Sequence, residues 1–293
     1  MGNAIGDKAA KILAAVKGTA SDGKKDTLLA KLGESLTVHE LEAMLKSSQI
    51  SRIAPTVMDW SDAYFKFGFM TDTHIGHAKF REDWLYRAYN LWEREKCEFV
   101  VHGGDISEGM SGRPGHVYEL SEVGYHAQFR RARDLLRSCP IPIKAVAGNH
   151  DLWWLQKNDL GVLIGAELQD ALGKEQFSYL GEHEGQLVLN GLSVTVWHGA
   201  DGRAYAKSYR AQKIVESLRG GEKPHILLLG HTHDRVGLQV RNVQVVEGGT
   251  LSAQTSFMRY RTRSEIAPGV HIVEAWGKGT LERFRTEWVP FFD

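Results

Sequence analysis

Cysteine, excess charge and long apolar runs are all scarce in this sequence of 293 residues. Its two cysteines, Cys97 and Cys139, are too few for a disulfide framework and too scattered for a thiolate metal site. The 36 basic residues are balanced by 36 acidic ones, so no net field draws the protein to nucleic acid or to an anionic membrane. No apolar stretch has the length of a membrane span, and the first residues lack a secretory cleavage pattern. We therefore expect a reduced, cytoplasmic protein that makes no membrane contact.

The first part of the chain differs in composition from the rest. Alanine, lysine and leucine are frequent there, and apolar residues recur at helical spacing, as Ile12 and Val16 do. Thr37 followed by Glu40 is a capping-box pattern that opens a further helix. We predict a small N-terminal helical segment over residues 1–54, which either docks a partner protein or forms a helix-turn-helix-like module.

The remainder, residues 62–293, is expected to be one larger domain. Apolar, strand-like runs such as YFKFGFM and HILLLG occur in it, and helix-like segments at 81–96 and 125–137 separate the earlier runs. This alternation predicts an α/β domain. Turn signals predict hairpins later in the chain, at Asn190-Gly191, at Arg241-Asn242 and at 277–279.

Side chains that commonly bind metals directly follow five of the apolar runs. They are carboxylate, amide and imidazole groups: Asp72 and His74, Asp105, Asn149, His198, and His231 and His233. Each loop alone is an ordinary turn pattern, but loops at the carboxyl ends of strands in an open α/β sheet meet in one crevice. Together the seven side chains predict a metal site. Their oxygen and nitrogen donors suit Mn²⁺, with Fe, Zn, Co or Ni as alternatives.

The order of these motifs resembles that of the calcineurin-like metallophosphoesterases: Asp-x-His, Gly-Asp, Gly-Asn-His-Asp, His and Gly-His-x-His. The resemblance covers about residues 64–288, and it implies a four-layer fold of two facing mixed β-sheets flanked by helices. It also implies two divalent ions. The first ion would take Asp72, His74, Asp105 and His233, and the second would take Asp105, Asn149, His198 and His231. His150 would be the catalytic histidine that is not a ligand, and Asp151 the carboxylate that orients it.

The resemblance implies hydrolysis of phosphate esters. Two ions roughly 3.5–4 Å apart hold a phosphoryl oxygen and lower the pKa of a water, so that a metal-bound hydroxide attacks phosphorus in line. His150 would then act as the general acid toward the leaving oxygen.

Details of the loops separate the branches of this family. Protein phosphatases of the family carry an arginine soon after Gly-Asp and a glutamate after Gly-Asn-His, whereas residues 104–109 contain no arginine and Asp151 replaces the glutamate. Residues 71–76 are similar to the opening motif of SbcCD-type repair nuclease subunits. Residues 104–151 are similar to the exonuclease subunit of archaeal family D DNA polymerases. We therefore expect a phosphodiesterase that acts as a nuclease on DNA or RNA, for example an exonuclease.

Basic clusters supply candidate contacts with a nucleic-acid strand. They are a group that interleaves cations with an aromatic ring and a separate pair: Arg259, Tyr260, Arg261 and Arg263, and Arg130 and Arg131. The alternative is that these clusters are solvated surface. Two other functions stay open, hydrolysis of small nucleotides and a non-catalytic scaffold of the polymerase-accessory type. The complete set of ligand-type side chains argues against the scaffold.

Overall fold

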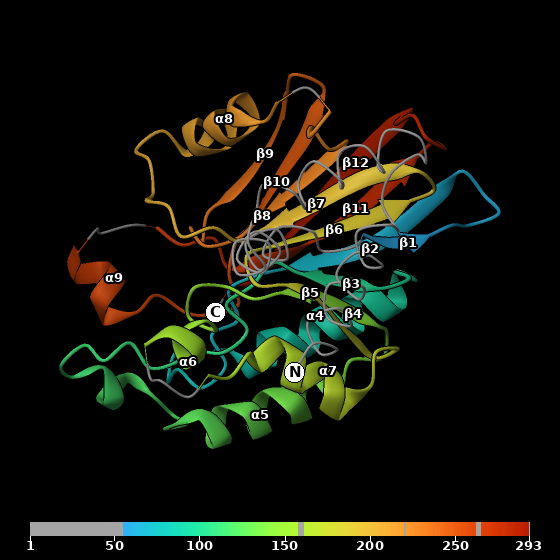
Figure 1. Ribbon diagram of the computed structural model, residues 1–293. Helices are drawn as coiled ribbons and strands as arrows, with labels where there is room; N and C mark the ends of the chain where they lie inside the picture. The colour runs from blue at the N-terminus through green and yellow to red at the C-terminus, as the bar shows by residue number, and fades with distance from the viewer. Residues whose placement is uncertain (1–54, 158–160, 220, 262–264, 293) are drawn as a thin grey trace, which may run out of the picture. The chain divides into compact units, whose positions relative to one another are not determined.

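The computed structural model describes residues 55–157, 161–219, 221–261 and 265–292, and within these ranges two six-stranded sheets lie face to face (Figure 1). The N-terminal helical segment predicted over residues 1–54 lies outside the described residues. Both sheets are mixed, because each contains parallel and antiparallel strand pairs.

The strand order of the first sheet is β1 (Thr56–Met58), β6 (Glu184–Leu189), β7 (Leu192–Trp197), β8 (Ile226–Leu229), β10 (Val243–Gly248) and β9 (Arg235–Val240). The strand order of the second sheet is β12 (Arg283–Pro290), β11 (Gly269–Trp276), β2 (Tyr64–Met70), β3 (Val100–His102), β4 (Ile143–Val146) and β5 (Phe177–Gly181). The first sheet thus begins with β1, ahead of residue 62, where the sequence placed the start of the larger domain.

An apolar core fills the space between the sheets. Alternate side chains of β2, Phe65, Phe67 and Phe69, are fully buried and share one cluster with Val194 and Leu228 of the facing sheet. Replacing one of these phenylalanines by alanine would remove about 3–5 kcal/mol of stability. The period-2 pattern of β2 therefore determines which face of its sheet meets the other sheet.

Helices cover the outer faces of the sheets. The helices α4 (Glu82–Arg94), α5 (Tyr125–Arg137) and α7 (Ile164–Leu172) pack on the second sheet, and α8 (Lys207–Ser217) packs on the first. Gly68 of β2 allows α4 to approach closely, because a Cβ at this position would lie 2.5 Å from the indole of Trp92. The four layers confirm the fold expected from the sequence.

Local predictions agree with this architecture. The helices expected at 81–96 and 125–137 are α4 and α5. The turn between β6 and β7 has Asn190 and Gly191 at φ of 51° and 75°, the left-handed values that a tight hairpin turn requires. Among the residues that the structure describes, no helix is long and apolar enough to cross a membrane.

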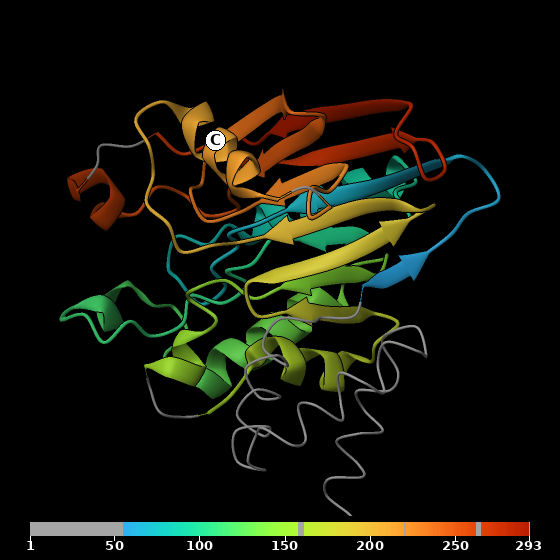
Figure 2. The ribbon, with the colours of Figure 1, turned by 45° about the horizontal axis from the view of Figure 1, so that its top comes forward.

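The fold brings the carboxyl ends of several strands to one end of the molecule. β2, β3 and β4 are parallel neighbours in the second sheet, and β7 and β8 are parallel neighbours in the first. Three short helices, η1 (His116–Glu119), α6 (Trp153–Gln156) and α9 (Ser256–Arg261), lie around this end, on the left of Figures 1 and 2. Loops that follow parallel strands therefore converge there.

Candidate metal centre

The seven side chains predicted as metal ligands all lie in one cluster at this end of the sheets. Nitrogen and oxygen atoms within 4.8 Å of one another form three overlapping groups: Asp72, His74 and His233; His74, Asp105 and His150; and Asp105, His198 and His231. The seventh, Asn149, places its Oδ1 3.2 Å from Nε2 of His198 and 2.8 Å from Nδ1 of His231. The cluster could hold metal ions, because its donors are of the kinds that divalent metals prefer.

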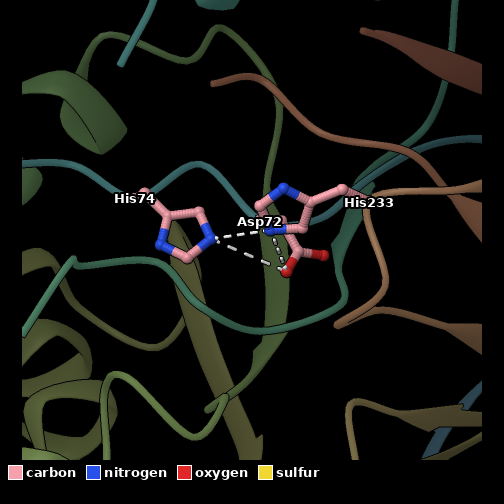
Figure 3. Close-up of side chains that lie close together, drawn as sticks. All are labelled: Asp72, His74 and His233. Carbon is pink, nitrogen blue, oxygen red and sulfur yellow. Dashed lines mark hydrogen bonds and ion pairs between the residues drawn. The ribbon is translucent and has the colours of Figure 1, made fainter. Parts of the chain in front are cut away.

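Asp72, His74 and His233 point toward one another (Figure 3). Oδ2 of Asp72 accepts hydrogen bonds from Thr71 and from the backbone of His231. Its Oδ1 is buried and accepts no hydrogen bond from the described residues, although Nε2 of His233 and Nε2 of His74 lie 3.2 and 3.8 Å away. A buried carboxylate oxygen without a partner is costly, and a cation bound between these atoms would remove that cost.

Asp105 lies between the two groups of donors. Its Oδ1 accepts from the backbone N–H of His150 at 2.8 Å. Its Oδ2 lies 3.2 Å from Nε2 of His198 and 3.8 Å from Nε2 of His74. One oxygen atom therefore faces both groups, as a ligand shared by two ions must.

The backbone at this site is strained. Asp72, His74, Asp105, His231 and His233 all have φ between 51° and 84°, a region that costs non-glycine residues about 1–3 kcal/mol each. Two glycines leave space for the side chains of Asp105 and His198. A Cβ on Gly148 would lie 2.1 Å from Oδ1 of Asp105, and one on Gly104 would lie 2.5 Å from Nδ1 of His198. The positions of the donor atoms are thus held against local backbone preference by the surrounding fold.

A second layer of hydrogen bonds orients the imidazoles. Nδ1 of His74 donates to Glu108 at 2.8 Å, and Nδ1 of His198 donates to the carbonyl of Gly103 at 2.7 Å. In the neutral form of each ring, which is the form that binds a metal, the proton on Nδ1 leaves the lone pair on Nε2, and Nε2 is the atom that faces the carboxylates.

The charges of the cluster depend on one another. Burial raises the pKa of Asp72, but the nearby His233 and His74 outweigh burial and hold that pKa well below its usual range. Burial lowers the pKa of His198, but Asp105 outweighs burial and raises it to about 9. The carboxylates therefore stay ionised and attract positive charge, as a cation site requires.

His150 lies beside the donor cluster, and its ring is held differently from the sequence expectation. Nδ1 of His150 donates to the backbone carbonyl of Glu108 at 2.8 Å, and the indole of Trp153 packs against the ring with centroids 3.9 Å apart. Asp151 was expected to orient His150. Instead its two carboxylate oxygens accept from the backbone N–H groups of residues 106, 107 and 148 and from a serine hydroxyl. Asp151 thus joins two of the converging loops, and Glu108 positions His150.

Glu108 is the functional residue that sequence reasoning missed. Besides its contacts with His74 and His150, Oε1 of Glu108 accepts from Nε2 of His116 at 2.8 Å. Burial raises the pKa of Glu108, but hydrogen bonds from His116 and His74 and the nearby ring of His150 outweigh burial and keep the pKa well below its usual range. A carboxylate three residues after Asp105 was the signal in the sequence that could have pointed to it.

A cavity of about 640 Å³ opens onto the cluster, and His74, Asp105, His150, His231 and His233 all line it. Two cations, Arg113 and Lys157, also line it, and neither was singled out from the sequence. Arg113 pairs with Glu119 at 2.7 Å, and the Lys157 ammonium lies 4.2 Å from the ring of Trp153.

The described residues that were predicted to contact substrate do not line this cavity. Arg259 and Tyr260 are exposed on α9, beside Thr255 and Met258, which line the cavity. On α5, Arg130 is exposed and Arg131 pairs with Glu82 at the start of α4. None of these four described residues lines the cavity. The predicted contacts Arg261 and Arg263 have side chains outside the described part of the chain.

A model of the calcineurin-like phosphoesterase superfamily domain matches residues 65–265. The chain belongs to the calcineurin-like phosphoesterase superfamily. Members of this superfamily typically bind divalent metals, which agrees with the donor cluster.

Relatives of the chain include archaeal DNA polymerase subunits. The DNA polymerase II small subunit of Methanothermobacter thermautotrophicus is 26% identical over 251 residues, which cover 72% of this chain and 51% of the relative. The subunit of the same name from Archaeoglobus fulgidus is 25% identical over 271 residues, covering 76% and 54%. The chain therefore spans about half the length of the curated relatives it matches. Among solved structures, an archaeal phosphodiesterase is 18% identical with a TM-score of 0.46, covering 77% of this chain and 100% of its own.

Proposed function

We propose that this superfamily member is a two-metal phosphodiesterase that hydrolyses nucleic-acid strands, with DNA as the favoured polymer. The observation that carries the proposal is the cluster of seven oxygen- and nitrogen-donor side chains beside one cavity, which four of them line, with the buried Oδ1 of Asp72 lacking a hydrogen bond. Asp72, His74 and His233 would hold one ion, Asn149, His198 and His231 the other, and Asp105 both. This donor set favours Mn²⁺. Two such ions, when bound, stabilise charge on the phosphoryl oxygens and activate a water.

His150 would supply the proton in this reaction. Because its Nδ1 donates to the Glu108 carbonyl, Nε2 is the ring atom available to a leaving oxygen. Burial lowers the pKa of His150, but Asp105 and Glu108 raise it by more, and the net upward shift favours the protonated ring. Trp153 and the Glu108 carbonyl would keep that ring in place while the ester bond breaks.

Two observations support a polymer as substrate. The cavity wall carries the cations Arg113 and Lys157, and exposed Arg259 and Tyr260 lie on α9 next to its lining residues. The relatives are named as DNA polymerase II small subunits, which favours DNA and a larger protein partner, with residues 1–54 as the proposed docking segment. Such a role would place the protein in the cytoplasm.

The test is a panel of substrates. Purified protein with Mn²⁺ is incubated with single-stranded DNA, duplex DNA, RNA and bis-p-nitrophenyl phosphate, with Asp105→Ala as a control for contaminating nucleases. We expect hydrolysis of DNA and of the small diester, and loss of both in the variant and in EDTA, because the variant removes the oxygen shared by both ions. Hydrolysis of the small diester alone would indicate small nucleotides. No hydrolysis of any substrate would indicate a non-catalytic scaffold.

A further inference from the structure

Two projecting segments flank the mouth of the cavity. The loop that contains η1 contributes Ser111, Arg113 and His116 to the lining, and the α9 segment contributes Thr255 and Met258. Figures 1 and 2 both show α9 and the η1 loop projecting from the same side of the two sheets. A strand that approaches the donor cluster from this side would pass near both segments.

Each segment carries an exposed aromatic ring. Tyr118 on η1 and Tyr260 on α9 are both 89% exposed. Val117 and Val123, near Tyr118, are also exposed. Single exposed apolar residues are common on protein surfaces, but rings on both segments beside one cavity mark a contact surface.

Positive charge accompanies the rings. Arg113 on the η1 loop, which pairs with Glu119, and Lys157 at the end of α6 both line the cavity, and Arg259 is exposed next to Tyr260. Cations that follow a backbone, together with aromatic rings on which bases stack, are how proteins hold single-stranded nucleic acid. The chain has no net charge, so attraction to phosphates must come from such local groups.

We propose that Tyr118 and Tyr260 stack on unpaired bases on either side of the scissile phosphate, and that this pair makes the site selective for single strands. The inference rests on the proposed function and deepens it by naming the substrate class. In a duplex the bases are paired and stacked on one another, so their faces are closed to both rings. Arg113 and Lys157 would contact the strand's phosphates between the two rings.

The test compares kcat/KM for a fluorescently labelled single-stranded oligonucleotide, the same sequence as a blunt duplex, and bis-p-nitrophenyl phosphate, all with Mn²⁺. Tyr118→Ala and Tyr260→Ala should each lower kcat/KM on the single strand by roughly tenfold relative to the small diester, through KM, because base stacking is lost. Tyr118→Phe should cleave the single strand with the kcat/KM of wild type, unlike Tyr118→Ala, since stacking needs the ring and not the hydroxyl. Tyr209→Ala is the matched control, because Tyr209 is 53% exposed on α8, which contributes no residue to the cavity lining.

The outcomes separate this inference from the function on which it rests. If wild type cleaves the single strand and both alanine variants match Tyr209→Ala on it, the stacking role is wrong and the nuclease function stands. Equal or faster cleavage of the duplex by wild type would also overturn single-strand selectivity. Hydrolysis of the small diester without any cleavage of DNA would overturn the polymer substrate together with the stacking role.

Discussion

Replacement of Glu108 by glutamine tests whether the metal centre is organised as proposed. The carboxylate accepts from Nδ1 of His74 and from Nε2 of His116, both at 2.8 Å, and its backbone carbonyl accepts from His150. Glu108→Gln keeps the size and the backbone contact to His150. It exchanges one acceptor oxygen for an NH₂ group, which can only donate.

The NH₂ group of the new amide can face either His74 or His116, and each orientation removes one hydrogen bond present in the wild-type protein. If the NH₂ group faces His74, the imidazole proton must move to Nε2, the atom proposed to bind metal. If the NH₂ group faces His116, the imidazole proton must move to Nδ1 of His116. In the wild-type protein this Nδ1 accepts from the backbone N–H of Ser111 at 3.2 Å, and that hydrogen bond would be lost. Loss of such an outer contact typically lowers metal affinity about 10- to 100-fold. This range corresponds to about 1.4–2.7 kcal/mol.

Isothermal titration of the metal-free variant with Mn²⁺ measures this effect. We expect weaker binding of the ion assigned to Asp72, His74 and His233, and little change at the other ion. Glu119→Gln is the control on the same cavity wall, because its carboxylate pairs with Arg113. Wild-type affinity for both ions in Glu108→Gln, or an equal loss at both, would refute the idea that Glu108 acts through His74.

Three further predictions test other parts of the molecule. His150→Ala should lower kcat by about 10²–10⁴ while metal content, measured by mass spectrometry, persists; a variant that purifies without metal would contradict the non-ligand assignment. Arg210→Met leaves the buried carboxylate of Glu247 without its ionic partner, so unfolding in urea should show a loss of about 3–5 kcal/mol; a loss below about 1 kcal/mol would contradict this. Burial lowers the pKa of His271 to about 3, whereas its pKa in the unfolded chain is near 6.5. The free energy of unfolding is therefore not reduced by this histidine above about pH 6.5, and it falls as the pH drops from there toward 3, because the unfolded chain takes up the proton first. In metal-free protein, His271→Gln should reduce the slope of unfolding free energy against pH in that window by up to ~1.4 kcal/mol per unit, and an unchanged slope would refute the assignment.

The sequence by itself determined several of the strands, helices and turns and the ligand-type residues. A period-2 run such as 64–70 encodes a buried strand, and Asn190-Gly191 encodes a hairpin turn, because both depend on interactions within a few residues. The donors could be identified for the same local reason. Each directly follows an apolar run, several are next to glycine, and their order along the chain matches that of one superfamily.

Only the tertiary structure decided which side chains meet around the donors. Glu108 reaches His74 across 34 residues and His150 across 42, while Asp151 turns to backbone N–H groups. Likewise Arg131 pairs with Glu82, whereas Arg113 lies on the cavity wall. Such contacts depend on the paths of loops whose residues hold left-handed backbone angles against local preference. Those paths come from the packing of the two sheets, so no local sequence pattern encodes them.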